Sequence, residues 1–414
     1  MNATAGEIIG CRDCGTFQVL PPSGRRDVLL CVTCDTELER RTGRRRDLAL
    51  AFSLSTLLLL IPANTFPFLS TALLGASRRS YLISSMTSMW DLDWPFLGIV
   101  IGLVLVFLPI LRFGMLSVVL ASLRLNYRPP WLGMLFRWSD ELKMWAMTDV
   151  FLLALWVAYA RMAATVVTHI EVGGYCFITA GLCTLLTRAT LDKTRVWRAI
   201  GSGSGPGERE EARTDVPRHG LACPACDLTL EEGFEGHRCP RCRGRVTRRF
   251  AGSVNIAVAL TVAGMLLYIP ANLYPIATIP IGLVSLSYNV LGGVIDLFKA
   301  HLIGLGLLVF TASFAIPCVK LVGIAWCLSS ILLRSRHALK TKTRAYRVIE
   351  EIGRWSMVDP LTIACFVPVT QFNASISSSA DMAAPFFTAV VLLTMAAARV
   401  FDPRLMWDAA RTHP

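Results

Sequence analysis

Charged residues are scarce in this sequence. Of its 414 residues, 17% are charged and 54% are hydrophobic, whereas an ordinary soluble domain has about 25% charged residues. This scarcity excludes a typical soluble globular protein and indicates an integral membrane protein.

Common catalytic motifs are also absent. The sequence has no phosphate-binding G-x-x-x-x-G-K-[ST] motif, no H-E-x-x-H motif and no serine nucleophile elbow. The glycine-rich stretch at 201–207 lacks the lysine that a phosphate-binding loop requires. Nothing before Leu48 is apolar enough to be a cleaved secretory signal. We therefore expect neither an enzyme nor a site for a nucleotide energy source.

Long apolar runs are present instead. A helix that crosses the hydrocarbon core of a membrane takes about 20 residues. Eight runs reach this length, and they begin near Leu48, Phe96, Trp145, Gly173, Val254, Leu302, Trp355 and Met382. The sequence therefore predicts an all-α integral membrane protein with eight transmembrane helices.

Lys and Arg residues lie almost entirely on one side of these spans. If the N-terminus is cytoplasmic, the cytoplasmic segments carry 35 of the 41 basic residues, and the outer loops carry only Arg78, Arg79 and Lys299. Basic residues accumulate in cytoplasmic loops, so we expect both termini in the cytoplasm. Membrane topology accounts for the net charge of +12, and we expect no nucleic-acid partner.

A seven-residue motif occurs twice, 208 residues apart. Residues 61–67 read I-P-A-N-T-F-P and residues 269–275 read I-P-A-N-L-Y-P, each at the end of an apolar run. Two prolines so close together end or kink a helix, and an irregular backbone inside a membrane needs protein or water around it. The predicted helix-break residues are Pro62, Asn64, Pro67, Pro270, Asn272 and Pro275, with Pro317 in a later span.

The duplication covers most of the chain. Pro109 and Arg112 precede Pro317 and Lys320 by 208 residues, and W-A-M-T-D at 145–149 aligns with W-S-M-V-D at 355–359. Because each unit has an even number of spans, the two units have the same orientation and form parallel repeats. The predicted segments are an N-terminal zinc ribbon at 1–47, a first transmembrane domain of four helices at 48–200, a flexible linker at 201–219, a second zinc ribbon at 220–250 and a second transmembrane domain of four helices at 251–414.

A cysteine quartet precedes each transmembrane domain. Eight of the 13 cysteines form four C-x-x-C pairs in segments predicted to be cytoplasmic, where thiols stay reduced and metal binding is favoured over disulfides. Four thiolates suit tetrahedral zinc, and rubredoxin-like iron is the alternative. The predicted ligands of two structural zinc ions are Cys11, Cys14, Cys31, Cys34, Cys223, Cys226, Cys239 and Cys242.

Lys320 interrupts the longest apolar run of the sequence. An ionisable residue inside a membrane is a functional candidate, although a lysine near the end of a span can instead extend to the headgroups. Ser313 lies seven residues earlier on the same helical face, and Thr394 of the last span is a candidate to meet that face. Thr394 could equally bond its own backbone carbonyl, and Asp359 either joins this polar cluster or caps its helix.

The first half lacks one member of the predicted cluster, because Leu105 aligns with Ser313. We therefore predict that residues 269–275 are the working copy of the repeated motif and that residues 61–67 are largely structural.

The combination of these features resembles the paraquat-inducible protein A family over nearly the whole chain. The resemblance rests on duplicated four-span units, each preceded by paired C-x-x-C motifs and each containing P-A-N-x-[FY]-P. Within the family, the chain is most similar to the lipophilic envelope-spanning tunnel protein A branch. The resemblance implies a multi-pass protein of the bacterial inner membrane whose partner is a periplasmic tunnel of MCE (mammalian cell entry) domains. It also implies that phospholipid or another lipophilic molecule is transported, and that Ser313, Lys320 and Thr394 form a polar cluster.

Three functions are compatible with these observations. In the first, the protein transports lipid and supports outer-membrane integrity, and Lys320 in a cleft of the second half pairs with a headgroup phosphate or exchanges a proton. In the second, the protein is a structural anchor or regulator of the tunnel, and the outer segments 70–95 and 276–300 carry the function. In the third, iron in the cysteine quartets makes the protein a membrane electron carrier.

Overall fold

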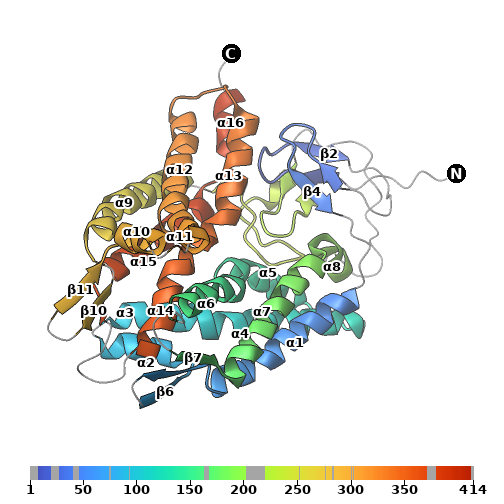
Figure 1. The fold of residues 1–414 in the computed structure, drawn as a ribbon. Helices are drawn as coiled ribbons and strands as arrows, with labels where there is room; N and C mark the ends of the chain where they lie inside the picture. The colour runs from blue at the N-terminus through green and yellow to red at the C-terminus, as the bar shows by residue number, and fades with distance from the viewer. Residues whose placement is uncertain are drawn as a thin grey trace.

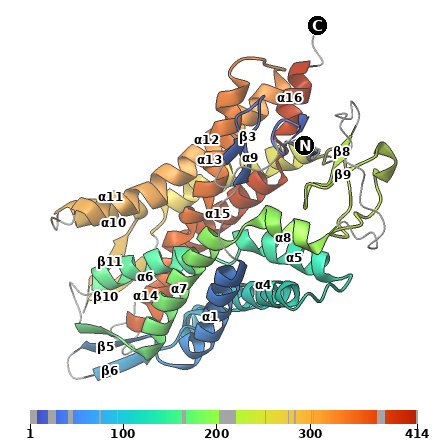
Figure 2. The same cartoon turned by 90° about the vertical axis from the view of Figure 1, so that its right-hand side faces the viewer.

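The computed structural model describes residues 8–19, 28–40, 46–73, 76–92, 94–162, 167–201, 220–250, 252–275, 277–281, 284–299, 301, 303–370 and 379–411. Apart from Gly201, the predicted linker at 201–219 lies outside these residues. Long helices form the body of the molecule, and two small three-stranded sheets lie at one end of it (Figure 1). The segments that carry the cysteine quartets lie at the opposite end, as the rotated view also shows (Figure 2).

The first half of the helical body begins with a long apolar helix and ends with a short amphipathic one. Its elements are α1 (Arg46–Thr65), β5 (Leu69–Leu73), β6 (Ala76–Ser80), α2 (Ser84–Asp91), α3 (Pro95–Gly102), the π-helical turn η1 (Leu103–Phe107), α4 (Leu108–Arg124), α5 (Leu132–Glu141), the 3-10 turn η2 (Leu142–Met144), α6 (Thr148–Met162), β7 (Val167–Ile170), α7 (Val172–Thr190) and α8 (Lys193–Ile200).

The second half has corresponding elements in the same order. They are α9 (Ser253–Leu273), β10 (Ala277–Ile281), β11 (Val284–Tyr288), α10 (Val290–Lys299), α11 (Ile303–Phe310), the π-helical turn η4 (Thr311–Ala315), α12 (Ile316–Leu332), α13 (Leu339–Gly353), the 3-10 turn η5 (Arg354–Met357), α14 (Val358–Thr370), β12 (Ser379–Ala380), α15 (Ala383–Val400) and α16 (Arg404–Arg411). The two π-helical turns begin 208 residues apart, which is the spacing of the repeated motif.

Seven helical segments in the described part of the chain are long and apolar enough to cross a membrane. They lie at Arg46–Thr65, Pro95–Arg124, Leu132–Ala160, Val172–Thr190, Ser253–Leu273, Ile303–Leu332 and Ala383–Val400. The eighth predicted span, near Trp355, corresponds to α14, of which the structure describes 13 residues, and it is not among these seven segments. Large apolar side chains such as Leu58, Leu266 and Val322 are more than half exposed, as expected for helices that face lipid. The chain is therefore a multi-pass, mostly helical membrane protein.

Two three-stranded sheets have the same strand order. In each, the strand that follows the first long helix is central: the orders are β6-β5-β7 and β11-β10-β12, and all pairs are antiparallel. Ser70 pairs with both Arg79 and His169, and Ala277 pairs with both Tyr288 and Ala380. Each sheet therefore ties the start of its half to the connection before the last long helix.

The packing of the helices also corresponds between the halves. Helix α1 packs against α7, and α9 packs against α15, while α14 packs against α6 where the two halves meet. The rings of Phe68, Phe151 and Phe177 pack together in the first half, and the ring centroids of Phe151 and Phe177 are 4.9 Å apart. The largest buried apolar cluster includes residues of both halves, among them Phe151 and Phe387, so the hydrophobic effect holds the halves together.

Candidate functional site

The repeated motif ends its helix in the same way in both halves. Pro62 and Pro270 lie inside α1 and α9, and each helix continues for three more residues. The Asn64 side chain donates to the carbonyl oxygen of Leu60 at 2.7 Å, and Asn272 donates to that of Tyr268 at 2.9 Å. These bonds tie each asparagine side chain to the turn before it, which holds the last turn of the helix closed.

The last proline of each motif copy connects two long helices. The carbonyl oxygen of Pro67 accepts a hydrogen bond from the backbone of Gly173 at 2.9 Å, and that of Pro275 accepts one from Ala383 at 3.2 Å. A Cβ at Gly173 would lie only 2.5 Å from the carbonyl oxygen of Phe66, so the first half requires glycine at this joint. Each motif copy therefore connects the end of α1 or α9 to the start of α7 or α15.

The two π-helical turns lie directly before Pro109 and Pro317. Proline lacks the N–H group that would bond the carbonyl four residues earlier, and these carbonyls belong to Leu105 and Ser313. The chain responds with a wider turn, in which Leu108 donates to Leu103 and Ile316 donates to Thr311. Such π turns are frequent at functional sites.

The ammonium group of Lys320 lies inside the protein, between α12 and η5. Lys320 is 1% exposed, and its Nζ donates to the carbonyl oxygen of Gly353 at 3.1 Å and to Ser356 Oγ at 3.4 Å. Gly353 borders this pocket closely, since a Cβ added there would lie 3.3 Å from Lys320 Cε. An ammonium group has three donors, so within the described residues one donor of Lys320 has no acceptor.

Ser313 and Thr394 are both fully buried. Thr394 Oγ1 donates to the carbonyl oxygen of Val391 in its own helix, at 3.0 Å. The hydroxyl of Ser313 has no hydrogen-bond partner among the described residues. Asp359 is half-buried in the first turn of α14. The structure thus brings Lys320 to Gly353 and Ser356, and in the described part of the chain Lys320 forms no hydrogen bond with Ser313 or Thr394.

Arg112 occupies the position in α4 that Lys320 occupies in α12, and it is also buried. Its guanidinium lies over the ring of Phe113, with Cζ 4.9 Å from the centroid. Two of its nitrogen atoms, Nε and Nη1, have no hydrogen-bond partner among the described residues. The first half therefore contains a buried cation whose surroundings differ from those of Lys320.

Asp149 forms an ion-pair cluster that joins the two halves. In the sequence it stood out only as the last residue of the repeated W-x-M-x-D segment, and its arginine partners were not predicted. Arg188 Nη1 lies 2.6 Å from Asp149 Oδ2, and Nη1 of Arg354, from the second half, lies 3.8 Å from the same oxygen. The side chain of Asp149 is 2% exposed. The one sequence signal was the position of Arg354 directly before the repeated W-x-M-x-D segment.

The cysteine quartets lie in two small modules. The first cysteine module comprises residues 8–19 and 28–40, with β1 (Ile8–Gly10) paired to β2 (Phe17–Val19) and β3 (Val28–Leu30) paired to β4 (Glu37–Arg40). The second cysteine module comprises residues 220–250, with β8 (Leu221–Ala222) paired to β9 (Thr229–Leu230), followed by the 3-10 turn η3 (Glu232–Phe234).

All four C-x-x-C turns have the same backbone geometry, although the turns are separated by different lengths of chain in the two modules. In each, the residue after the second cysteine has a positive φ and donates to the carbonyl of the first cysteine, at 2.8 to 3.0 Å. These residues are Gly15, Asp35, Asp227 and Arg243. The turn directs both sulfur atoms of a pair to the same side.

The sulfur atoms suit a tetrahedral metal ion. Within each quartet the four Sγ atoms lie within 4.8 Å of one another, and the shortest separations are 3.5 Å for Cys11 and Cys34 and 3.5 Å for Cys223 and Cys242. Zinc–sulfur bonds of about 2.3 Å in a tetrahedron place sulfur atoms about 3.8 Å apart. All eight cysteines are buried, so each quartet could hold one ion with no position left for substrate.

Each cysteine module contacts its own half, where Glu39 pairs with Arg198 and Arg249 pairs with Asp408, and it also makes crossed contacts with the opposite half. The metal-ligand turns of the first cysteine module contact the second half: Cys34 O accepts from Arg347 at 3.0 Å, and Trp407 packs against the quartet. The second cysteine module contacts the first half, where a Cβ at Gly133 would lie 1.9 Å from the carbonyl oxygen of Arg241. The modules also contact each other, through an ion pair between Arg12 and Asp227.

The profile of the family described as "Paraquat-inducible protein A" matches residues 47–201 and 254–411. Intermembrane transport protein PqiA of Escherichia coli (strain K12) is 28% identical over 409 residues, which cover 98% of this chain and 96% of that protein. Lipophilic envelope-spanning tunnel protein A of the same strain is 27% identical over 408 residues, covering 98% and 92%. A probable intermembrane transport protein of Haemophilus influenzae is 25% identical over 416 residues, covering 97% and 96%.

No solved structure matches the chain significantly. The family profile matches each half once and covers more than half of the chain in total. The relatives are named as transport or tunnel proteins of the cell envelope, in agreement with the expectation of a non-enzymatic membrane protein. The chain belongs to the paraquat-inducible protein A family.

Proposed function

We propose that this protein transports phospholipid or another lipophilic molecule between the bacterial inner membrane and a periplasmic tunnel of MCE domains, and so supports outer-membrane integrity. It would be built as two parallel repeats, each a structural zinc ribbon and four transmembrane helices. The names of the relatives, which refer to intermembrane transport and to an envelope-spanning tunnel, support a role that links two membranes.

The arrangement of the two ends supports the proposed orientation. The cysteine modules lie at one end of the helical body and the two sheets at the other (Figures 1 and 2). The basic residues accumulate in the segments at the end with the modules, which favours that end as cytoplasmic. The sheets would then lie in the periplasm, where a tunnel partner is available.

The observation that carries the proposal is the buried ammonium of Lys320. Its two hydrogen-bond acceptors, Gly353 O and Ser356 Oγ, are neutral, and it forms no ion pair among the described residues. A buried cation without an anion is costly. A headgroup phosphate would supply both the negative charge and an acceptor for the remaining N–H, and the buried hydroxyl of Ser313 would add a donor from the adjacent π-helical turn.

Lys320 is tested by two substitutions in a lipid-transfer assay between inner-membrane and outer-membrane vesicles with the partner present. Lys320→Met should abolish transfer because it fills the pocket without a charge or donor, whereas Lys320→Arg should retain part of it. Zinc content and yield report whether the variant is folded. Transfer at the wild-type rate by Lys320→Met would refute the site.

A second candidate function is an anchor that seats or regulates the tunnel and has no lipid path of its own. The two sheets at one end of the body favour it, because they offer a paired docking surface for a periplasmic partner. In that case, Lys320 variants would function like wild type, and substitution of Arg78 and Arg79 in β6 would abolish binding of the partner. The electron-carrier alternative requires iron, so stoichiometric zinc in colourless protein would end it.

A further inference from the structure

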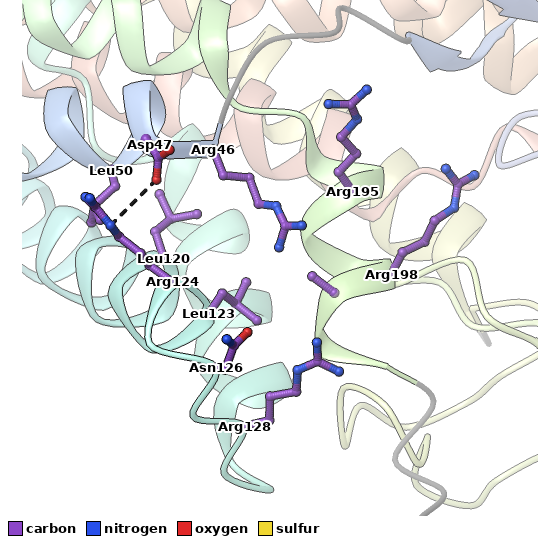
Figure 3. A pocket seen from close by; sticks show the side chains of 11 residues that line it. Arg46, Asp47, Leu50, Leu120, Leu123, Arg124, Asn126, Arg128, Arg195 and Arg198 are labelled. Carbon is purple, nitrogen blue, oxygen red and sulfur yellow. Dashed lines mark ion pairs between the residues drawn. The ribbon is translucent and has the colours of Figure 1, made fainter. Parts of the chain in front are cut away.

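A cavity of about 750 Å³ lies between the N-terminal end of α1, the C-terminal end of α4 and α8. Figure 3 shows that basic side chains surround it. The lining arginines are Arg46, Arg124, Arg128, Arg195 and Arg198. Asp47 is the one carboxylate among the lining residues, so the cavity has a strong excess of positive charge.

Three of these arginines have carboxylate partners. Arg124 lies 3.7 Å from Asp47, Arg195 lies 3.2 Å from Asp192, and Arg198 pairs with Glu39 of the first cysteine module at 2.8 Å. These contacts keep the walls of the cavity in place.

Arg46 and Arg128 form no ion pair among the described residues. Both guanidinium groups extend into the space between α4 and α8 (Figure 3). Two planar guanidinium groups that face one space are suited to a phosphate, because each can donate two parallel hydrogen bonds to its oxygen atoms.

The apolar lining residues of the cavity belong mainly to α1 and α4. Leu50 lies one turn inside α1 from Arg46, and Leu120 lies one turn inside α4 from Arg124. Both helices are candidate membrane spans, and their arginines lie at the ends where headgroups are expected. An anion that also carries acyl chains therefore fits this cavity better than a soluble anion does, and basic pockets between membrane helices are known binding places for anionic headgroups.

Most of the basic lining of the cavity is specific to the first half. By the repeat alignment, Arg46 and Arg124 correspond to Val254 and Leu332, and Arg195 and Arg198 correspond to Leu405 and Asp408. None of these four counterparts is basic, whereas Arg128 corresponds to Arg336, so four of the five lining arginines are specific to the first half.

We propose that this cavity binds the phosphate of an anionic glycerophospholipid, held between Arg46 and Arg128 as a resident lipid distinct from transported cargo. The lipid would bridge α1, α4 and α8, and through Arg198 and Glu39 it would adjoin the first cysteine module. This site does not depend on Lys320, because Lys320 belongs to the second half and lies between α12 and η5.

The experiment measures lipid binding to the full-length protein in detergent by native mass spectrometry. The protein is titrated with phosphatidylglycerol, and phosphatidylcholine is the zwitterionic comparison. The test variant is Arg46→Gln with Arg128→Gln. The matched control is Arg334→Gln with Arg344→Gln, which removes the same charge from exposed positions in the second half.

One basic residue near an anionic lipid surface is worth about fivefold in binding, so the test variant should bind phosphatidylglycerol about 25-fold more weakly than wild type. The control variant and Lys320→Met should bind within about twofold of wild type. Arg46→Lys with Arg128→Lys should retain the part of the affinity that depends on charge alone, which would exclude misfolding as the cause. Equal losses in test and control, or equal binding of both lipids, would overturn the proposal. Displacement of the lipid by soluble glycerol 3-phosphate would identify a free phosphate ligand and would also overturn it.

Discussion

Lys320 Nζ and the carbonyl oxygen of Gly353 lie 3.1 Å apart, and the missing side chain of Gly353 leaves the space for the lysine. The two residues are 33 positions apart and belong to α12 and α13. The polar site of the second half therefore depends on a backbone carbonyl at the end of one helix.

Gly353→Ala should push the end of the Lys320 side chain away from its acceptors and weaken their hydrogen bonds without unfolding the protein. A Cβ would lie 3.3 Å from Lys320 Cε, and φ at this position is −55°, which alanine adopts readily. A hydrogen bond to a charged group contributes about 2 kcal/mol, so lipid transfer should fall by about tenfold or more. The control is Gly304→Ala in α11, where an added Cβ meets nothing within 4 Å. An unchanged rate of lipid transfer for Gly353→Ala would show that transport does not depend on this contact.

Cys226→Ser should remove one metal ion from the protein. The four sulfur atoms of the second quartet lie within 4.8 Å of one another, and zinc holds a complete set of four thiolates far more tightly than an incomplete one. Elemental analysis should give two zinc ions per chain for wild type and one for the variant. Cys183→Ser, which lies in α7 outside both quartets, should keep both. A full metal content in Cys226→Ser would contradict the assignment.

Asp149→Asn should destabilise the contact between the halves. The substitution removes the buried carboxylate shared by the half-buried Arg188 and Arg354, although Arg354 keeps its pair with Glu351, so the loss should approach the lower end of the about 3–5 kcal/mol that breaking a buried pair costs. Thermal unfolding in detergent measures this loss. Asp296→Asn removes an exposed carboxylate whose oxygen lies 3.8 Å from Lys299, and this surface pair should contribute less than about 1 kcal/mol. Similar unfolding temperatures for the two variants would argue against the cluster.

Stability should fall as the pH rises from about 4.5, because of Glu350 in α13. Burial raises the pKa of the Glu350 carboxyl above its ordinary value of 4.5, although Arg399 opposes the shift. In the range between the two values, the folded protein holds a proton that the unfolded chain has lost, so folding is favoured at the lower pH of that range.

Glu350→Gln should flatten this part of the stability profile. Unfolding curves at several pH values provide the measurement, and Glu235→Gln in the second cysteine module, an exposed position, provides the comparison. If the stability of Glu350→Gln fell with pH as steeply as that of wild type, another titrating group would be responsible for the pH dependence.

The sequence carried much information about elements and little about contacts between them. Apolar runs predicted the long helices, and the C-x-x-C spacing predicted two quartets, because both patterns depend on neighbouring residues. Pro317 predicted a break in the hydrogen bonding of its helix. Helix propensity did not predict that the chain would respond with a π-helical turn, closed by the bond from Ile316 to Thr311.

Contacts between distant segments could not be predicted in this way. Lys320 and Ser356 are 36 residues apart, and Asp149 and Arg354 lie in different halves. Such pairs depend on how helices pack, which a single sequence does not specify. The cavity between α1, α4 and α8 was missed for the same reason, because its arginines appeared only as basic flanks of membrane spans.

The crossed modules have a consequence for a chain that is cut between residues 201 and 220. Each module contacts the helices of the opposite half, through Arg347 and Trp407 on one side and Gly133 on the other. The two fragments on either side of the cut, when they are expressed separately, should therefore associate and purify as one complex.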